Sequence, residues 1–170
     1  MVTGIHHVTA IASSPRMNID FYTGILGVRL VKKTVNFDVP ETYHFYYGDE
    51  VGHPRSILTF FPYNGLIKGS HGTGFLNTTT FSHPFDSLDY WNSRLKKIKV
   101  NTKDPQKRFQ NEVVVYLKNP DGLGIELVFN EGDISSGFTY GHIPQEHSIK
   151  GFFNVESWVK GFERTAGLLT

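Results

Sequence analysis

One order of predicted elements occurs twice in this chain of 170 residues, and this repeat constrains the fold more than any other feature. The first unit is a strand, a helix started by Pro15 and three further strands, over residues 4–12, 13–26, 28–36, 43–47 and 56–61. The second unit repeats the order with a strand, a helix, a short edge strand with its loop and two strands, over residues 75–81, 86–98, 99–108, 113–117 and 124–129. The two units start about 70 residues apart, a period typical of a duplicated module and too long for a solenoid.

This repeat predicts an α+β fold built from paired βαβββ modules over about residues 3–63 and 72–131, which together form one domain, 1–131. A glycine-rich connection over 64–72 separates the modules, and residues 132–150 form a predicted linker. A strand over 151–159 and the beginning of a helix then open a third module, 151–170, that is incomplete. We expect apolar surface without partner strands there, around Phe152, Phe153, Val155 and Trp158.

Composition excludes several classes of protein. The 17 basic and 16 acidic residues are interspersed, so we expect neither nucleic acid nor an anionic membrane as a partner. No cysteine is present, which rules out disulfides and restricts metal ligands to His, Asp and Glu. The sequence has no signal-like N-terminal pattern and no apolar run of membrane-spanning length, so we expect a cytoplasmic protein.

The adjacent pair His6 and His7 is the first candidate for chemistry. Alternation along a strand lets only one of the two face a cavity. Glu126 is the second candidate, because a carboxylate inside an apolar strand must be paired, hydrogen-bonded or metal-bound. Two plainer interpretations stay open, namely a hydrogen-bonded structural histidine and a glutamate on the solvent face of its strand. A non-haem iron site needs two His and one carboxylate on one face, and these residues alone do not complete it.

The other histidines divide into two groups. His44 alternates with Phe45 and Tyr46 on a predicted middle strand and could line the same cavity. The remaining five lie beside Gly, Pro or Ser in predicted turns, where we expect solvated side chains: His53, His71, His83, His142 and His147. The sequence contains neither a phosphate-binding glycine loop nor a nucleophile elbow, so nothing in it favours a nucleotide-binding protein or a serine hydrolase.

Several segments resemble the opening of the hydroquinone-type, ring-cleaving extradiol dioxygenases of the vicinal oxygen chelate superfamily, which also contains glyoxalase I and the bleomycin-resistance proteins. The similarity is dense over residues 4–63 and looser over 72–130. The segments that carry it are His6–Ile11, Asp20–Tyr22, Leu26–Gly27, Arg29–Asp38, Tyr43–His44, Tyr46–Asp49 and Leu58–Pro62.

This resemblance implies a site that holds Fe(II) or Mn(II), a small aromatic diol and dioxygen. It makes His7 the first metal ligand, while the His and Glu that complete the set belong to the family's second half, past residue 170. Glu126 matches the strand position that carries a Glu ligand in glyoxalase-type members. His44, Tyr46 and Tyr47 are expected in the substrate pocket.

We therefore expect the N-terminal part of a ring-cleaving dioxygenase for hydroquinone- or catechol-like aromatics, in which the chain alone binds metal weakly or not at all and is inactive. A homodimer is expected, because open strand edges favour association. Two alternatives remain. A glyoxalase-like, metal-dependent isomerase would need no dioxygen, and a resistance-type protein would bind an aromatic ligand without catalysis.

Overall fold

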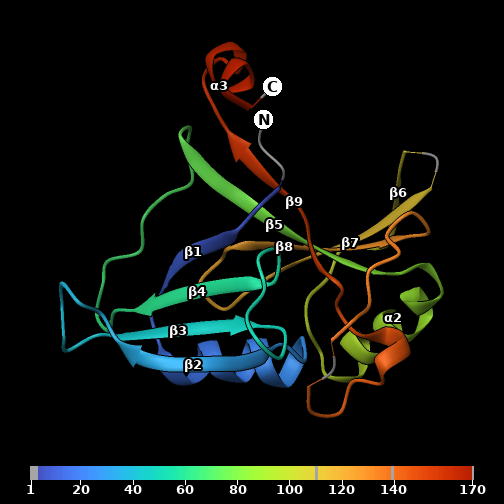
Figure 1. Cartoon of the computed structure of the whole chain (residues 1–170), viewed down its shortest axis with the longest axis horizontal. Coiled ribbons are helices and arrows are strands. Elements are labelled where there is room, and N and C mark those ends of the chain that lie inside the picture. Colours follow the sequence, from blue (N-terminus) through green and yellow to red (C-terminus); the bar gives the residue numbers. More distant parts are fainter. Residues whose placement is uncertain (1–3, 110, 139, 170) are drawn as a thin grey trace.

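Two mixed β-sheets, each with a helix against one face, form the molecule (Figure 1). The computed structural model describes residues 4–109, 111–138 and 140–169. The first sheet has the order β1-β4-β3-β2, from strands β1 (His7–Ala12), β2 (Arg29–Val35), β3 (Tyr43–Gly48) and β4 (Ile57–Pro62). β1 runs parallel to β4, and the other pairs in this sheet are antiparallel. The first βαβββ module is thus confirmed.

The helix of the first module begins where the sequence predicts. Ser14 has extended backbone angles and its hydroxyl accepts a hydrogen bond from the Met17 N–H, while Pro15 occupies the first turn of α1 (Pro15–Ile19). The helix continues as a π-helical segment, η1 (Asp20–Ile25). Gly27 then ends it with a φ of 67°, a backbone conformation that side chains other than glycine rarely adopt.

The second module repeats this arrangement. Its sheet has the order β6-β7-β8-β5-β9, from strands β5 (Phe75–Pro84), β6 (Gln106–Arg108), β7 (Glu112–Lys118), β8 (Gly124–Asn130) and β9 (Gly151–Trp158). β5 runs parallel to β8, as β1 does to β4. Helix α2 (Leu88–Lys97), preceded by the 3-10 turn η2 (Phe85–Ser87), buries Trp91 and Leu95.

The strand and helix expected after residue 150 are both present, as β9 and α3 (Glu163–Leu169). β9 is not without a partner, because it pairs antiparallel with β5 over most of its length. The expected apolar surface is therefore smaller than predicted. Phe152 is 2% exposed, and Phe153 and Val155 are partly buried, whereas Trp158 at the far end of β9 is 47% exposed.

The segment before β9 is more than a linker. Ile143 and Ile149 are buried in the same hydrophobic core as both helices, and a 3-10 turn, η3 (Gln145–His147), lies between them. Phe138 packs against this core. The 132–150 segment thus contributes to the packing of the domain that we expected it merely to follow.

Side chains also fasten the two modules to each other. The Arg94 guanidinium on α2 donates hydrogen bonds to the carbonyls of Gly24 (2.7 Å) and Ile25 (3.2 Å) at the end of η1. The Ser13 hydroxyl and backbone N–H, just after β1, both donate to one carboxylate oxygen of Asp121 in the β7–β8 turn. The described part of the chain contains no helix long and apolar enough to cross a membrane.

Candidate functional site on the open face of the first sheet

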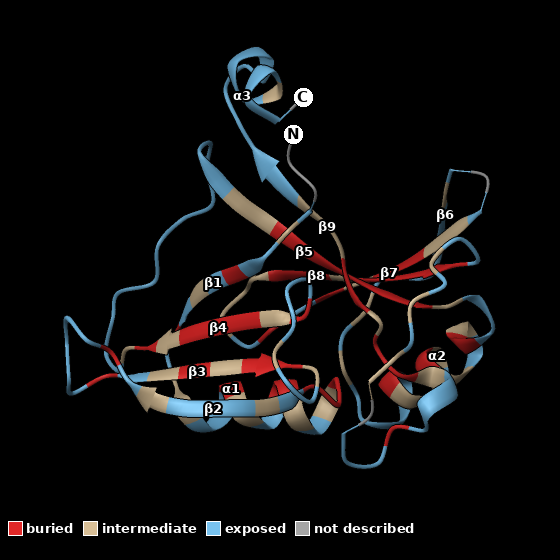
Figure 2. Ribbon diagram, in the orientation of Figure 1, coloured by how far each residue is buried: buried red, intermediate tan, exposed pale blue. Residues whose placement is uncertain are grey.

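The first sheet has one covered and one open face. Along β1 the side chains alternate, with Val8 and Ala12 buried and His7, Thr9 and Ile11 exposed. The α1–η1 segment packs on the buried side, and Figure 2 shows the buried positions of β3 and β4 next to it. Strand alternation therefore places the exposed residues of β1 on a face that this helix does not cover.

His6 and His7 both lie at the N-terminal end of this strand. Both side chains are exposed, their rings meet edge to face, and their Nδ1 atoms are 3.0 Å apart, so one ring donates a hydrogen bond to the other. His7 is the first residue of β1 and shares its face with Thr9, whose hydroxyl accepts a hydrogen bond from the Thr59 hydroxyl on β4. The His7 imidazole is thus accessible to a metal ion.

A cluster of three rings, from His44, Tyr46 and Phe61, lies further along the same face. The register of β3 against β4 puts His44 opposite Phe61, and their ring centroids are 4.0 Å apart. The Tyr46 ring lies 4.1 Å from His44, and the Tyr46 hydroxyl is 2.9 Å from His44 Nδ1. His44 Nε2 is buried and has no hydrogen-bond partner among the described residues. Three ring systems therefore meet on this face.

The surroundings of His44 disfavour its protonated form. Its pKa lies below the ordinary value, first because partial burial disfavours the imidazolium, and then because Lys32 and His7 place positive charge nearby. Lys32 also lies over the Tyr46 ring, with Nζ 5.5 Å from the centroid.

Tyr47 does not join this group. Because neighbouring residues of a strand point to opposite faces, Tyr47 points into the core, where it is fully buried and its hydroxyl donates a 2.8 Å hydrogen bond to Asn18. Burial also raises the pKa of its hydroxyl. Of the three residues expected in the substrate pocket, the structure brings His44 and Tyr46 together and places Tyr47 on the other side of the sheet.

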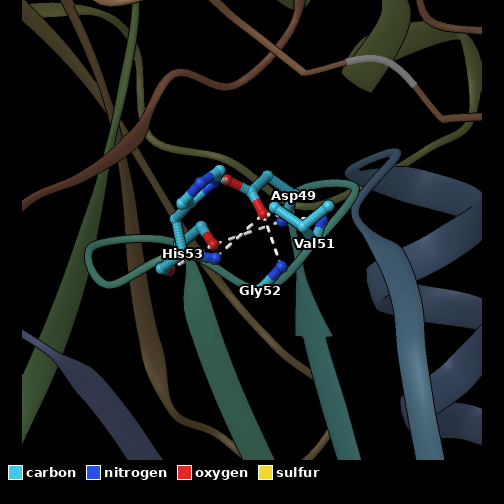
Figure 3. Close-up of polar contacts among 5 residues, drawn as sticks. Asp49, Val51, Gly52 and His53 are labelled. Atoms are coloured by element: carbon cyan, nitrogen blue, oxygen red, sulfur yellow. Dashed lines mark hydrogen bonds and ion pairs between the residues drawn. The ribbon is translucent and has the colours of Figure 1, made fainter.

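The loop between β3 and β4 is fixed by one carboxylate, drawn in Figure 3. Asp49 Oδ1 accepts hydrogen bonds from the backbone N–H groups of Val51, Gly52 and His53, and Oδ2 lies 2.7 Å from His53 Nδ1. Burial alone would raise the pKa of Asp49, but these hydrogen bonds hold it below its ordinary value. These bonds hold together the loop that joins the two strands carrying His44 and Phe61.

Glu126 lies in the other module and already has partners. Arg108 on β6 donates to its carboxylate at 2.7 Å, and the Thr80 hydroxyl donates at 3.2 Å. Arg108 also pairs with Glu112 at 3.1 Å. This ion pair supplies the charge compensation that a carboxylate in an apolar strand requires, so the position demands no metal ion.

A polar cavity of about 240 Å³ lies beside Glu126, lined also by Tyr116, Glu156 and Lys103. His7 is not among its lining residues. Within the described ranges, no three His, Asp or Glu side chains are grouped so that they could hold a metal ion. His7 and Glu126 therefore do not form a common site in this chain.

One histidine expected in a solvated turn is instead part of the core. β5 extends three residues further than predicted and carries His83, which is fully buried between Trp91 and Phe129. Burial lowers the pKa of His83 to about 3, although a hydrogen bond to the Phe81 carbonyl opposes this. The following Pro84 suggested a turn, and the apolar pattern of β5 gave too weak a signal to extend the strand.

Comparison with known proteins decides the family. The family model for the "Glyoxalase/Bleomycin resistance protein/Dioxygenase superfamily" matches residues 4–127. The chain belongs to this superfamily. The fold class expected from the sequence is thereby confirmed, together with the resemblance on which the functional expectations depend.

Among curated members of the superfamily, the chain is 40% identical over 168 residues to the "Putative ring-cleaving dioxygenase MhqO" of Bacillus subtilis (strain 168), covering 98% of this chain and 53% of that protein. It is 30% identical to the "Chlorohydroquinone/hydroquinone 1,2-dioxygenase" of Sphingobium indicum, covering 96% and 51%. The chain thus spans about half the length of these relatives.

Solved structures of superfamily members have a similar fold. A crystal structure of a dioxygenase named as putative from Bacillus subtilis has a TM-score of 0.90 at 42% identity, covering 98% of this chain and 53% of that one. A glyoxalase/bleomycin resistance protein/dioxygenase domain from Frankia sp. EAN1pec has a TM-score of 0.62 at 15% identity, covering 78% of this chain and 95% of that one. The second likeness concerns the fold alone.

Proposed function

We propose that this chain is the N-terminal part of a ring-cleaving dioxygenase for hydroquinone- or catechol-like aromatics. The observation that carries the proposal is the open face of the first sheet, where an accessible imidazole, His7, lies on the same face as the aromatic group His44, Tyr46 and Phe61. The similarity to proteins named as ring-cleaving dioxygenases supports the reaction type. The substrates would be a small aromatic diol and dioxygen.

In this proposal His7 supplies one ligand to Fe(II) or Mn(II), a metal that orients the diol and dioxygen when bound. The described residues alone do not fit such an ion, because they offer no group of three ligands. The remaining His and Glu would come from the half of the relatives that this chain does not cover. We therefore expect the chain alone to bind metal weakly or not at all, and to be inactive in ring cleavage.

The roles of the chain's own residues follow from their positions. The Tyr46 and Phe61 rings would contact the flat face of the aromatic substrate. His44 would hold the Tyr46 hydroxyl in place through the 2.9 Å hydrogen bond to its Nδ1. Since its Nε2 is buried, His44 would act as a positioning residue.

One experiment tests both the role of His7 as a metal ligand and the ring-cleavage reaction. The 170-residue chain would be fused to the half of MhqO that it does not cover, loaded with Mn(II) or Fe(II), and assayed for oxygen uptake with hydroquinone. We expect uptake by the fusion and none by the chain alone. His7→Ala should abolish uptake and weaken Mn(II) binding measured by titration, whereas His6→Ala should preserve both. Retention of activity and metal affinity in the His7→Ala fusion would contradict the proposal.

The rings on the open face of the first sheet also favour a second candidate function. In it, the chain would bind an aromatic ligand without metal, in the manner of resistance-type proteins. Fluorescence titration of the chain with hydroquinone in the presence of a chelator tests it. Saturable binding that Tyr46→Ala weakens, together with a fusion that consumes no oxygen, would favour this function. A glyoxalase-like isomerase would instead require metal and convert its substrate without oxygen uptake.

A further inference from the structure

Arg55, in the loop before β4, has a backbone conformation that residues other than glycine rarely adopt. It is the third residue of a turn that begins at His53 and is closed by a 3.2 Å hydrogen bond from the Ser56 N–H to the His53 carbonyl, and its φ is 76°. Glycine is the usual residue at a turn position with positive φ. An arginine there costs backbone strain that a glycine would avoid.

The second module has a glycine at the corresponding place. The turn before β8 contains Gly122 with a φ of 93°, two residues before Gly124, the first residue of β8. Arg55 likewise lies two residues before Ile57, the first residue of β4. The fold therefore accepts a glycine at this place, and the turn alone does not require an arginine.

The backbone of Arg55 connects the two sheets. Its N–H donates a 3.1 Å hydrogen bond to the carbonyl of His6, which directly precedes the first residue of β1, His7. Its carbonyl accepts a 2.7 Å hydrogen bond from the N–H of Phe152 on β9. These two hydrogen bonds, which we call the Arg55 bridge, join the His6–His7 end of the first sheet to a strand of the second.

The second sheet accommodates Arg55 closely. A Cβ on Gly151, which has a φ of 133°, would lie 3.0 Å from the Arg55 carbonyl oxygen. The Arg55 guanidinium lies 4.0 Å from Oδ2 of Asp133, whose side chain is 10% exposed. The Ser135 N–H donates to the Asp133 carboxylate at 2.9 Å, and the Lys150 ammonium donates to the Asp133 backbone carbonyl. The carboxylate is thus held in place next to the guanidinium.

We propose that Arg55 is a positioning residue, whose side chain keeps the His6–His7 end of β1 at a fixed place relative to β9. The contact with Asp133 holds the loop in the strained conformation in which the Arg55 N–H and C=O bind β1 and β9 at once. A glycine would allow this conformation and several others, so the bridge would open more often. The inference rests on the proposed function in one respect, since the position of His7 matters for catalysis only if His7 binds the metal.

The Arg55→Gly variant separates this role from that of an ordinary turn residue. It keeps both backbone groups of the bridge and relieves the strain, so the free energy of unfolding in urea should stay the same or rise. The amide hydrogens of residue 55 and Phe152 should nevertheless exchange roughly fivefold faster, measured by NMR on the metal-free chain. The amide of Val115, a buried residue of β7, reports on global unfolding and should not exchange faster.

Two further variants test whether the charge contact holds the bridge. Arg55→Lys keeps both the cation and the strain, so exchange at residue 55 and Phe152 should return close to that of the wild type. Asp133→Asn removes the opposite charge without changing the turn, and exchange at both amides should quicken roughly twofold to fivefold. Adding Asp133→Asn to Arg55→Gly should have no further effect, because the contact is already lost.

The position of the His6–His7 end has its own readout. The two imidazoles meet through their Nδ1 atoms, so the ring-proton signals of His7 should move in Arg55→Gly and return in Arg55→Lys. In the fusion with the uncovered half of MhqO, Arg55→Gly should lower oxygen uptake with hydroquinone roughly threefold or more, and Arg55→Lys should restore it.

Wild-type exchange at residue 55 and Phe152 in Arg55→Gly, or unmoved His7 signals, would overturn the proposal, and Arg55 would then be a turn residue alone. An equal acceleration at Val115 would also overturn it, because the variant would then have lost global stability. So would a fusion whose oxygen uptake is the same with Arg55→Gly as with the wild type. A wild-type fusion without oxygen uptake would refute the proposed function instead, and the exchange rates in the chain would still decide whether Arg55 holds the bridge.

Discussion

The two modules share one architecture but use their polar residues differently. In the second module, Arg108 bridges Glu112 and Glu126, and His83 is buried. In the first, the imidazoles of His6 and His7 are exposed and bond only to each other in the described structure. These polar side chains of the second module thus contribute to packing and charge balance, whereas the His6 and His7 imidazoles of the first module are exposed to solvent.

The largest expected effect on stability concerns His83, a buried polar residue of the second module. Its pKa of about 3 in the folded protein lies far below the ordinary value of 6.5, so the unfolded chain takes up a proton first as the pH falls. The stability that this histidine contributes is complete above pH 6.5 and is lost between there and about pH 3, at about 1.4 kcal/mol per pH unit. Urea unfolding of wild type and His83→Leu over this range measures it.

The variant removes the titrating group while keeping an apolar side chain between Trp91 and Phe129. Its unfolding free energy should fall less steeply than that of the wild type below pH 6.5, by the slope given above. The comparison of slopes is insensitive to any constant cost of the substitution. Parallel profiles for the two proteins would show that His83 is not held neutral by the core.

The next effect concerns the contact between the first module and the 132–150 segment. A Cβ on Gly27 would clash with Ile143 Cγ1, and Gly27 has a positive φ. Gly27→Ala should therefore lower the free energy of unfolding by about 2 to 3 kcal/mol. Gly24→Ala is the control, because a Cβ there meets no atom within 4 Å, and it should be nearly neutral.

A double-mutant cycle sharpens this test. In an Ile143→Ala background the clashing Cγ1 is absent, so Gly27→Ala should cost less than it does in the wild type. An equal cost in both backgrounds would leave only the backbone strain at Gly27. It would also mean that the segment before β9 is not packed against the first module.

A smaller effect is expected from the ion pairs of the second sheet. Arg108→Met leaves Glu112 and Glu126 without their cation, and the free energy of unfolding should fall by about 1 to 2 kcal/mol, less than for a fully buried pair because the side chains are partly exposed. Lys107→Met on the same strand changes an exposed side chain and should be nearly neutral. Adding Glu126→Gln to Arg108→Met should recover part of the loss, and no recovery would speak against the pairing.

Much of the fold was predictable because the two modules are built from regular local signals. Alternating apolar residues, Pro15 after a capping Ser14, and the glycine at position 27 each act within one or a few turns of chain. The short edge strand β6 was expected from polarity alone. The pairing of β9 with β5 was not, because it depends on contacts between residues about 75 positions apart, which periodicity does not encode.

The residues of the candidate site were likewise predictable where a local pattern places them, and not where a distant contact does. Alternation along one strand correctly separates His44 and Tyr46 from a neighbour such as Tyr47, and applying it to all three would have excluded Tyr47 from the face. The partner of Glu126 was not predicted, because the polar segment 99–108 indicated an edge strand but gave no register that would bring Arg108 to Glu126. The burial of His83 was missed for a related reason, since helix α2 supplies the side chain that covers it.

The smallest effect tests whether the groups on the open face interact as a unit. Lys32 is one of the positive charges that lower the pKa of His44, so Lys32→Met should raise that pKa, measured by NMR titration of the His44 ring protons. Lys33→Met is the matched control, because the neighbouring Lys33 lies over Tyr43 and is not among the charges that act on His44. High salt should reduce the difference between Lys32→Met and the wild type, since Lys32 is exposed. If both substitutions raise the pKa of His44 equally, the positive charge of β2 as a whole lowers this pKa. The position of Lys32 beside Tyr46 and His44 would then have no effect of its own.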